Sequence, residues 1–415
     1  MATIIAFIVV FFVLVLVHEF GHFIFAKRSG ILVREFSIGM GPKLIATRRN
    51  HTTYTLRLLP LGGYVRMAGW QDEDDEIKPG TQLAIELNSA GVVTRINTSD
   101  KTTLQGGIPV QVGKVDLTHD LVIEGYANGN EDELQHWAVD HDATIIEPDG
   151  TEVIIAPEDV QFQNASIWKR LLVNFAGPMN NFILAILVFI GVGAVAGVQQ
   201  LDTNQIGQIV QASPAAKAGL PANATIISVN GKQVASFTAI ANQVGKTAKG
   251  DAVRLRYRAP GSQAVKSLAI QPKSGTIGIY PSITHNFGTA VAYGFSETWS
   301  IATRIFHVLG QMVTGHFSLN KLAGPVGIYT MTSQAASGGV MSLVVFAAYL
   351  SVNLGVMNLI PIPVLDGGKI LLNLIELIRR KPLSQEKEGL VTLIGAGAMV
   401  LLMIAVTIND IMRQF

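Results

Sequence analysis

The stretch that decides the fold is residues 2–26, ATIIAFIVVFFVLVLVHEFGHFIFA, where an uncharged apolar run leads directly into His-Glu-Phe-Gly-His. A helix needs about 20 predominantly apolar residues to cross a bilayer, so this stretch is long enough. No basic residue precedes it and no small-residue cleavage site follows, which argues against a removable signal peptide. We therefore expect a retained membrane helix that carries three ionisable side chains.

Three further segments, residues 171–198, 340–360 and 390–408, are also apolar enough to span a membrane. The 415-residue chain is 49% hydrophobic and 15% charged, whereas soluble proteins have about 25% charged residues. It has no cysteine, which excludes disulfides, thiol catalysis and cysteine-bound zinc, and its net charge of +1 suggests no bulk nucleic-acid binding. The sequence predicts a polytopic α-helical membrane protein with four transmembrane helices.

The distribution of charge predicts how these helices are oriented. Lys27 and Arg28 follow the first span, Lys169 and Arg170 precede the second, and residues 379–387 between the last two spans are basic. Basic residues near span ends mark the cytoplasmic side. We therefore expect loops 27–170 and 379–389 to be cytoplasmic, and both termini and loop 199–339 to lie outside.

The loops predict folded parts of different character. Residues 31–68 alternate in polarity between turn sequences and predict a membrane-associated β-hairpin, with residues 54–58 as its edge strand. Of the 30 acidic residues, 20 lie within 72–159, where short apolar strands predict a small acidic β domain. Residues 72–76 are expected to be a solvated linker. The predicted divisions are 1–28, 29–69, 70–166, 167–198, 199–280, 281–339 (an amphipathic helix and a loop), 340–378 and 379–415.

His18, Glu19 and His22 form a HExxH motif, the most specific signal in the chain. Residues four apart share one face of a helix, so both imidazoles can bind one metal ion. Glu19 lies about 100° further round and is placed to act as a general base. Two ordinary core histidines are the alternative, but ionisable residues in a span are costly unless they have a function.

Catalytic zinc requires a third protein ligand, and Asp366 is the best candidate. It follows two prolines and precedes two glycines in NLIPIPVLDGG, residues 358–368, so the backbone is irregular at membrane depth, as is typical where a cavity is lined. An N-cap of the next helix is the alternative role for Asp366. Asn353 and Asn358 are interpreted as substrate contacts, whereas Asn174, Asn180 and Asn181 are expected to form hydrogen bonds between helices.

These motifs together resemble the site-2 protease family, most closely its bacterial regulator-of-sigma-E protease type. The resemblance covers both ends and the middle spans of the chain. It rests on HEFGH at 18–22, GMGP at 39–42, LPLGGYV at 59–65, NFAGPMN at 174–180 and NLIPIPVLDG at 358–367.

The resemblance implies roles for particular residues. It implies Zn²⁺ held by His18, His22 and Asp366, Glu19 as catalytic base, and substrate binding by the two asparagines at 353 and 358. The hairpin would receive the substrate as an added strand. Residues 205–272 are similar to one PDZ domain of this family, with matches at 213–220 and 226–231, although Asn-Ala at 223–224 replaces the usual Gly-Asp.

We therefore expect an intramembrane zinc metalloprotease in a bacterial cell membrane, with its active site near the cytoplasmic leaflet and its PDZ domain outside. Its expected partners are the lipid bilayer, single-pass membrane proteins such as anti-sigma factors, or signal-peptide remnants, and a peptide ligand of the PDZ domain, with no nucleic acid. The alternatives are a membrane zinc peptidase that acts on soluble or lipid-modified peptides, and a non-catalytic PDZ membrane scaffold with structural zinc.

Overall fold

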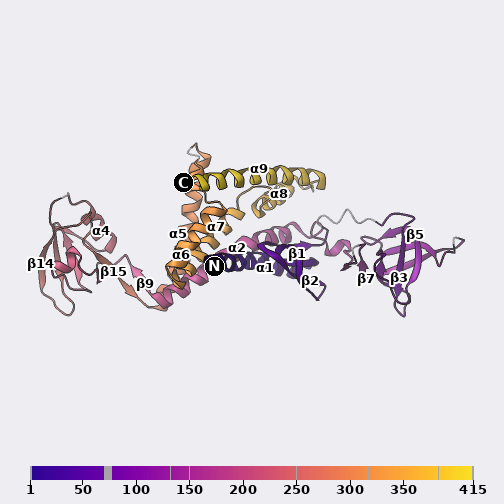
Figure 1. Cartoon of the computed structure of the whole chain (residues 1–415), viewed down its shortest axis with the longest axis horizontal. Helices are drawn as coiled ribbons and strands as arrows, with labels where there is room; N and C mark the ends of the chain where they lie inside the picture. Colours follow the sequence, from indigo (N-terminus) through magenta and orange to yellow (C-terminus); the bar gives the residue numbers. More distant parts are fainter. Residues whose placement is uncertain are drawn as a thin grey trace. The chain divides into compact units, whose positions relative to one another are not determined.

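The computed structural model describes residues 2–69, 77–130, 132–148, 150–248, 250–315, 318–381 and 383–413, with the elements labelled in Figure 1. The expected linker at 72–76 lies outside the described residues. The chain divides into two compact units: residues 1–185 together with 301–415, and residues 186–300.

Among the described residues, four helices are long and apolar enough to cross a membrane, as the sequence predicts. They are α1 (Ala2–Arg28), α2 (Ile167–Ala196), α7 (Val340–Asn358) and α9 (Gln385–Met412). Much of their apolar surface is exposed in the isolated chain. A surface of this kind is stable against lipid and unfavourable against water.

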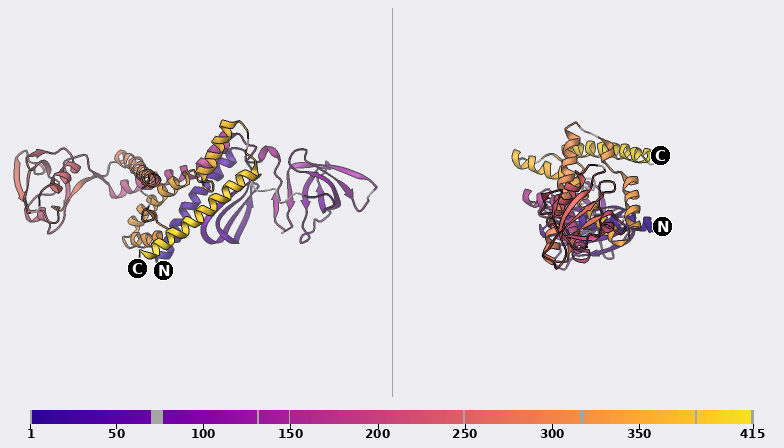
Figure 2. Two further views of the ribbon diagram at one scale, coloured as in Figure 1. Left: turned by 90° about the horizontal axis from the view of Figure 1, so that it is seen from above. Right: turned by 90° about the vertical axis from the view of Figure 1, so that its left-hand side faces the viewer.

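The predicted hairpin is formed by β1 (Val33–Arg49) and β2 (Thr52–Met67), which lie beside α1 (Figure 2). Both strands are bent, and the pairing places four segments in the order 45–49, 52–56, 35–38 and 63–67. Tyr54 therefore pairs with Thr47 on one side and Phe36 on the other. The expectation that residues 54–58 form an edge was wrong at residues 54–56, because the bend folds the first half of β1 against them and each is paired on both sides. The two edges are 45–49 and 63–67.

The acidic β domain is a closed barrel. Its strands are β3 (Gln82–Leu87), β4 (Val93–Asn97), β5 (Ile108–Asp116), β6 (Val122–Ala127), β7 (Leu134–Ile146) and β8 (Glu152–Ile154). The sheet order is β4-β3-β5-β6-β7-β8, and a parallel β4–β7 pairing closes it. Alternate residues such as Ile85, Ile96 and Ile123 fill the interior and are fully buried.

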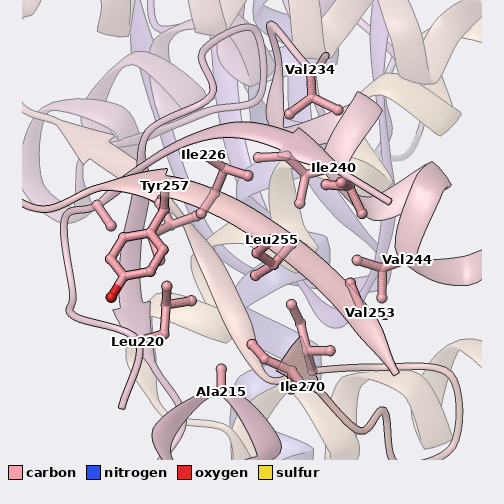
Figure 3. Packing of buried hydrophobic residues seen from close by; sticks show 14 residues of the cluster. Ala215, Leu220, Ile226, Val234, Ile240, Val244, Val253, Leu255, Tyr257 and Ile270 are labelled. Carbon is pink, nitrogen blue, oxygen red and sulfur yellow. The ribbon is translucent and has the colours of Figure 1, made fainter. Parts of the chain in front are cut away.

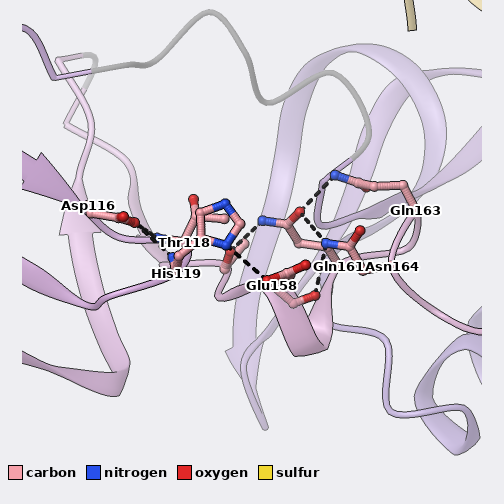
Figure 4. A network of polar contacts seen from close by, with 8 residues as sticks. Asp116, Thr118, His119, Glu158, Gln161, Gln163 and Asn164 are labelled. Atoms are coloured by element: carbon pink, nitrogen blue, oxygen red, sulfur yellow. Dashed lines mark hydrogen bonds and ion pairs between the residues drawn. The ribbon is translucent and has the colours of Figure 1, made fainter. Parts of the chain in front are cut away.

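A polar network joins the barrel to the 3-10 helix η2 (Glu158–Val160), which precedes α2 (Figure 4). The Glu158 amide donates to the Thr118 carbonyl at 2.9 Å, and the Glu158 carboxylate lies 2.9 Å from His119 Nδ1. Asn164 donates to the Glu158 carbonyl. The segment that leads into the second span is thus tied to the barrel by main-chain and side-chain bonds.

The unit of residues 186–300 contains two sheets with the orders β12-β11-β13-β14 and β10-β15-β9. Their strands are β9 (Val198–Gln200), β10 (Ile206–Ile209), β11 (Thr225–Val229), β12 (Lys232–Gln233), β13 (Val253–Arg258), β14 (Val265–Ile270) and β15 (Ile279–Thr284). Helices α3 (Pro214–Lys217) and α4 (Phe237–Gly245) begin after Ser213 and Ser236, whose hydroxyls cap them. Residues including Ile226, Ile240 and Leu255 form the core (Figure 3).

The remaining helices are α5 (Phe287–Val313), η3 (Leu319–Lys321), α6 (Pro325–Ser337) and α8 (Asp366–Arg379). Helix α5 carries exposed aromatic residues, among them Phe295 and Trp299, as expected for an amphipathic helix. The segment expected as a loop contains α6. Asp410 of α9 accepts hydrogen bonds from the amides of Gly324 and Gly327 and so caps this helix from another element.

Candidate metal centre

Helix α1 presents two buried imidazoles on one face. His18 and His22 are one helical turn apart, and their ring centroids lie 4.9 Å from each other. Their Nε2 atoms are 3.3 Å apart and point to the same place. A pair of imidazoles with converging nitrogens can bind one metal ion.

Asp366 reaches the same place from the first turn of α8. The chain breaks after α7, where Pro361 and Pro363 cannot continue a helix, and turns back sharply. A Cβ atom on Gly367 or Gly368 would overlap the backbone of residues 359–362, so glycine is needed for this turn. The turn leaves Asp366 buried, with its Oδ2 atom 3.2 Å from the Nε2 atoms of both histidines.

The three ligand atoms have the spacing of a zinc site. They form a triangle with sides of 3.2, 3.2 and 3.3 Å. Ligand atoms about 2.0–2.1 Å from a tetrahedral zinc ion are separated by roughly 3.3–3.4 Å. Asp366 Oδ2 is buried and has no hydrogen bond within the described part of the chain, so an acceptor is left for a cation. Two imidazoles and one carboxylate therefore fit zinc and leave a fourth position open.

Helix α2 packs against this triangle and orients the histidine rings. His22 Nδ1 donates to the Val173 carbonyl at 2.8 Å, which leaves Nε2 with a free lone pair. His18 Nδ1 lies 2.9 Å from the side-chain amide of Asn181. Between these contacts, Gly177 packs so tightly that a Cβ atom there would overlap His22 Nε2 and lie 2.9 Å from His18 Cε1.

Glu19 is half-buried and is not one of the three converging ligands. Its side chain extends towards β2, where a Cβ atom on Gly63 would come within 3.1 Å of Glu19 Cγ. The side chain of Glu19 thus leaves the helix that carries both histidines close to the 63–67 edge of the hairpin. A group in this place can exchange protons with a peptide held along that edge.

In the described part of the chain, the side chains of the two asparagines predicted for substrate binding form no hydrogen bond with the triangle. Asn353 is exposed and Asn358, the last residue of α7, is half-buried. Of the asparagines in the second span, Asn180 donates to the Val17 carbonyl of α1, as expected for a bond between helices. Asn174 Nδ2 has no partner in the described part of the chain. The contact of Asn181 with a histidine ring was not foreseen, although 173, 177 and 181 have the spacing of one helix face.

The family model for Peptidase family M50 matches residues 6–402. The chain belongs to peptidase family M50. It is 50% identical over 425 residues to the protease eep of Enterococcus faecalis, with all of both chains covered. Identity is 49% over 423 residues to a protein named as a zinc metalloprotease from Streptococcus pyogenes serotype M6, again covering both chains completely.

Another protein of that name, from Lactococcus lactis, is 45% identical to this M50 peptidase over 430 residues, which include all of this chain and 99% of the relative. The sequence-based prediction of a site-2 protease that uses zinc is confirmed at the level of family, enzyme class and metal. In this M50 peptidase, the buried triangle is the group of histidine and acidic side chains in the described residues that could hold the ion.

Proposed function

We propose that this peptidase cleaves membrane-spanning segments of other proteins, with zinc held by His18, His22 and Asp366. The observation that carries the proposal is the buried triangle of candidate ligand atoms, which come from an apolar helix long enough to span a membrane and from the helix that follows another such span. Ionisable side chains at such a depth are costly and are retained for function. The same observation favours a substrate that lies in the membrane over a soluble peptide.

Bound zinc would supply Lewis-acid chemistry, polarising the scissile carbonyl and lowering the pKa of water. Glu19 takes a proton from the attacking water as the new C–O bond forms, and then delivers it to the amide nitrogen as the C–N bond breaks. The products are a carboxylic acid, which then releases its proton to water, and an amine, and Glu19 returns to its starting state. Its position next to the 63–67 edge supports this role, because the proton then has a short path to the peptide.

The hairpin edge at 63–67 is the proposed docking place for the substrate backbone. A helical substrate has its amides engaged in i→i−4 bonds and must unwind before cleavage, and pairing with a sheet edge replaces those bonds. Within the described residues, segment 63–67 pairs only with β1. Asn353 and Asn358 make no side-chain hydrogen bond to described residues, so their amides are available to hold freed backbone groups.

We also propose the arrangement in a bacterial cell membrane. Basic residues at span ends support an active site near the cytoplasmic leaflet, with the acidic barrel in the cytoplasm and residues 199–280 outside. A small α/β fold with two serine-capped helices supports a PDZ domain for the outer part. It would select substrates by their outer segments. Single-pass anti-sigma factors and signal-peptide remnants fit this arrangement, which is that of regulated intramembrane proteolysis.

The test compares the Glu19→Gln and Asp366→Ala variants in purified full-length protein. We expect Glu19→Gln to keep zinc and lose cleavage of a single-span substrate, because it removes the proton carrier and no ligand. Asp366→Ala is expected to lose both zinc and cleavage. Elemental analysis and gel assays measure the two effects. Normal zinc in a folded Asp366→Ala protein, or normal turnover in Glu19→Gln, would refute the assignment. If Glu19→Gln keeps zinc and loses cleavage, as expected, the proteins that co-purify with this variant would identify the natural substrates.

A further inference from the structure

One face of α2 packs against the imidazole rings of both histidines. Val173, Gly177 and Asn181 are successive members of an i, i+4, i+8 series, so they lie in a row along the helix. The helices approach closely here because glycine occurs on both sides. A Cβ atom on Gly21 of α1 would overlap the Ala176 carbonyl, as one on Gly177 would overlap His22. This close approach brings the far side of each imidazole within hydrogen-bonding distance of α2.

A histidine that binds zinc through Nε2 must carry its proton on Nδ1, and that proton needs an acceptor. For His22 the acceptor is the main-chain carbonyl of Val173, which no substitution removes. For His18 the neighbour is the side-chain amide of Asn181, which is fully buried. The two histidines thus have equivalent contacts with the same helix, one made by the main chain and one by a side chain.

The orientation of the Asn181 amide identifies its role. In the structure Nδ2 faces His18 Nδ1, and Oδ1 is buried with no hydrogen-bond partner in the described residues. The oxygen and nitrogen of an amide are nearly equal in size, so turning the amide about its last torsion fits the same space. After this turn Oδ1 accepts the Nδ1 proton of His18. The change pairs the orphan oxygen and leaves the Nε2 lone pair directed at the metal position.

We propose that Asn181 is a positioning residue of the metal centre: its side-chain oxygen accepts the Nδ1–H of His18, fixing the tautomer and the ring for zinc. The proposal rests on the proposed ligation by His18. The position of Asn181 is itself held, because its main-chain carbonyl accepts a hydrogen bond from Ser351 of α7 at 2.8 Å. Hydrogen bonds to ligating histidines typically change metal affinity by about 10- to 100-fold when they are lost.

The experiment measures zinc affinity of the full-length, detergent-solubilised chain by competition with a chelator. Asn181→Leu has nearly the same volume and no acceptor, and we expect it to bind zinc about 10- to 100-fold more weakly. Asn181→Asp retains an acceptor and is expected to stay close to the wild-type affinity. Asn181→Ala serves the same purpose as the leucine variant if leucine prevents folding.

The matched control is Asn180→Leu, which removes the neighbouring bond to the Val17 carbonyl between the same two helices and does not touch His18. Its zinc affinity should be unchanged. The proposal is overturned if Asn181→Leu, folded, binds zinc within about threefold of wild type. It is equally overturned if Asn180→Leu loses as much affinity as Asn181→Leu, or if Asn181→Asp is as weak as Asn181→Leu, because packing would then be the cause.

Measuring the zinc affinity of a His18→Ala variant distinguishes failure of the positioning role of Asn181 from failure of the assignment of His18 as a ligand. Loss of tight zinc binding in His18→Ala, with no effect of Asn181→Leu, would leave the ligand set intact and remove only the positioning role. Unchanged zinc affinity in His18→Ala would overturn the ligand assignment and the role of Asn181 with it.

Discussion

Replacing Arg57 by methionine should loosen the hairpin that lies next to Glu19. The guanidinium donates hydrogen bonds to Glu35 Oε1 at 2.8 Å and to the Tyr64 hydroxyl at 2.6 Å. It also donates to Ser37 Oγ and to the Gly41 carbonyl. These partners lie in different segments of the bent sheet, so one side chain holds the segments together.

The expected loss can be worked out from these contacts. Breaking a buried ion pair from one side costs about 3–5 kcal/mol, because the other charge stays buried without its partner. The side chains of Arg57 and Glu35 are 16% and 12% exposed, and Glu35 keeps its hydrogen bond from Thr55. We therefore expect the lower end, about 3 kcal/mol, which increases local opening by roughly 100-fold. Burial raises the pKa of Glu35, but the bonds from Thr55 and Arg57 outweigh it and hold the pKa below its usual value.

Hydrogen exchange of the amides in residues 33–67 measures this opening. The matched control is Arg49→Met, an exposed arginine of the same hairpin, which should change exchange little. The double variant Glu35→Gln/Arg57→Met should recover much of the loss, since no unpaired charge remains. Cleavage should fall in Arg57→Met while zinc content stays normal. Exchange that is unchanged in Arg57→Met would show that this cluster does not hold the hairpin together.

Three further predictions concern other parts of the chain. Asp410→Ala should destabilise α6 by about 2 kcal/mol, because one buried and one partly buried amide lose a charged acceptor, and exchange in residues 325–337 would report it. His141 donates hydrogen bonds to the carboxylates of Asp142 and Asp159, which raise the pKa of its imidazole. This contact therefore stabilises the junction of the barrel with η2 below about pH 6.5 and is lost as pH rises through the folded pKa. The protection of amides near η2, measured relative to their intrinsic exchange rates, should therefore fall between pH 6 and 8. Gly177→Ala should weaken zinc binding by about 10- to 100-fold, since overpacking costs about 1–3 kcal/mol, as chelator competition would detect.

Conservative variants provide the controls for these three predictions. Asp410→Asn keeps one acceptor oxygen and should lose less than the alanine variant. His141→Gln should remove the pH dependence at η2, and its persistence would assign the effect to another group. Gly389→Ala, on a part of α9 with open space around it, should leave zinc binding unchanged. Equal effects of Gly177→Ala and Gly389→Ala would argue against the predicted collision.

The sequence predicted which three side chains converge, because the physical signal is local and strong. His18 and His22 are one turn apart in an apolar span, and Asp366 is an isolated carboxylate between helix-breaking residues. The bend of the hairpin was not predicted, since the alternation around Tyr54 identifies a strand and says nothing of its neighbours. The cap of α6 by Asp410 joins residues more than 80 positions apart, and no periodicity connects them.

The partners of buried amides and the helical state of α6 could not be predicted, because the same residue types occur in more than one kind of structure. Asn180 and Asn181 are adjacent amides in the same span, yet one bonds a carbonyl and the other faces an imidazole. Composition cannot separate these cases, because a buried amide suits either partner. The 13 residues of α6 include one glycine, two serines and two threonines, which are weak helix formers, and packing against α1, α7 and α9 makes the segment helical.

The two ends of the barrel insertion meet at one point. The Phe162 amide donates to the Ala68 carbonyl, and the Leu32 amide donates to the Val160 carbonyl, both at 2.9 Å. The path from α1 to α2 could therefore be closed by a few residues at this junction, with the hairpin and metal ligands left in place. The barrel is thus a domain inserted between two neighbouring points of the chain. It could be replaced by another domain, in related proteins or by design, while the centre that performs the chemistry stays unchanged.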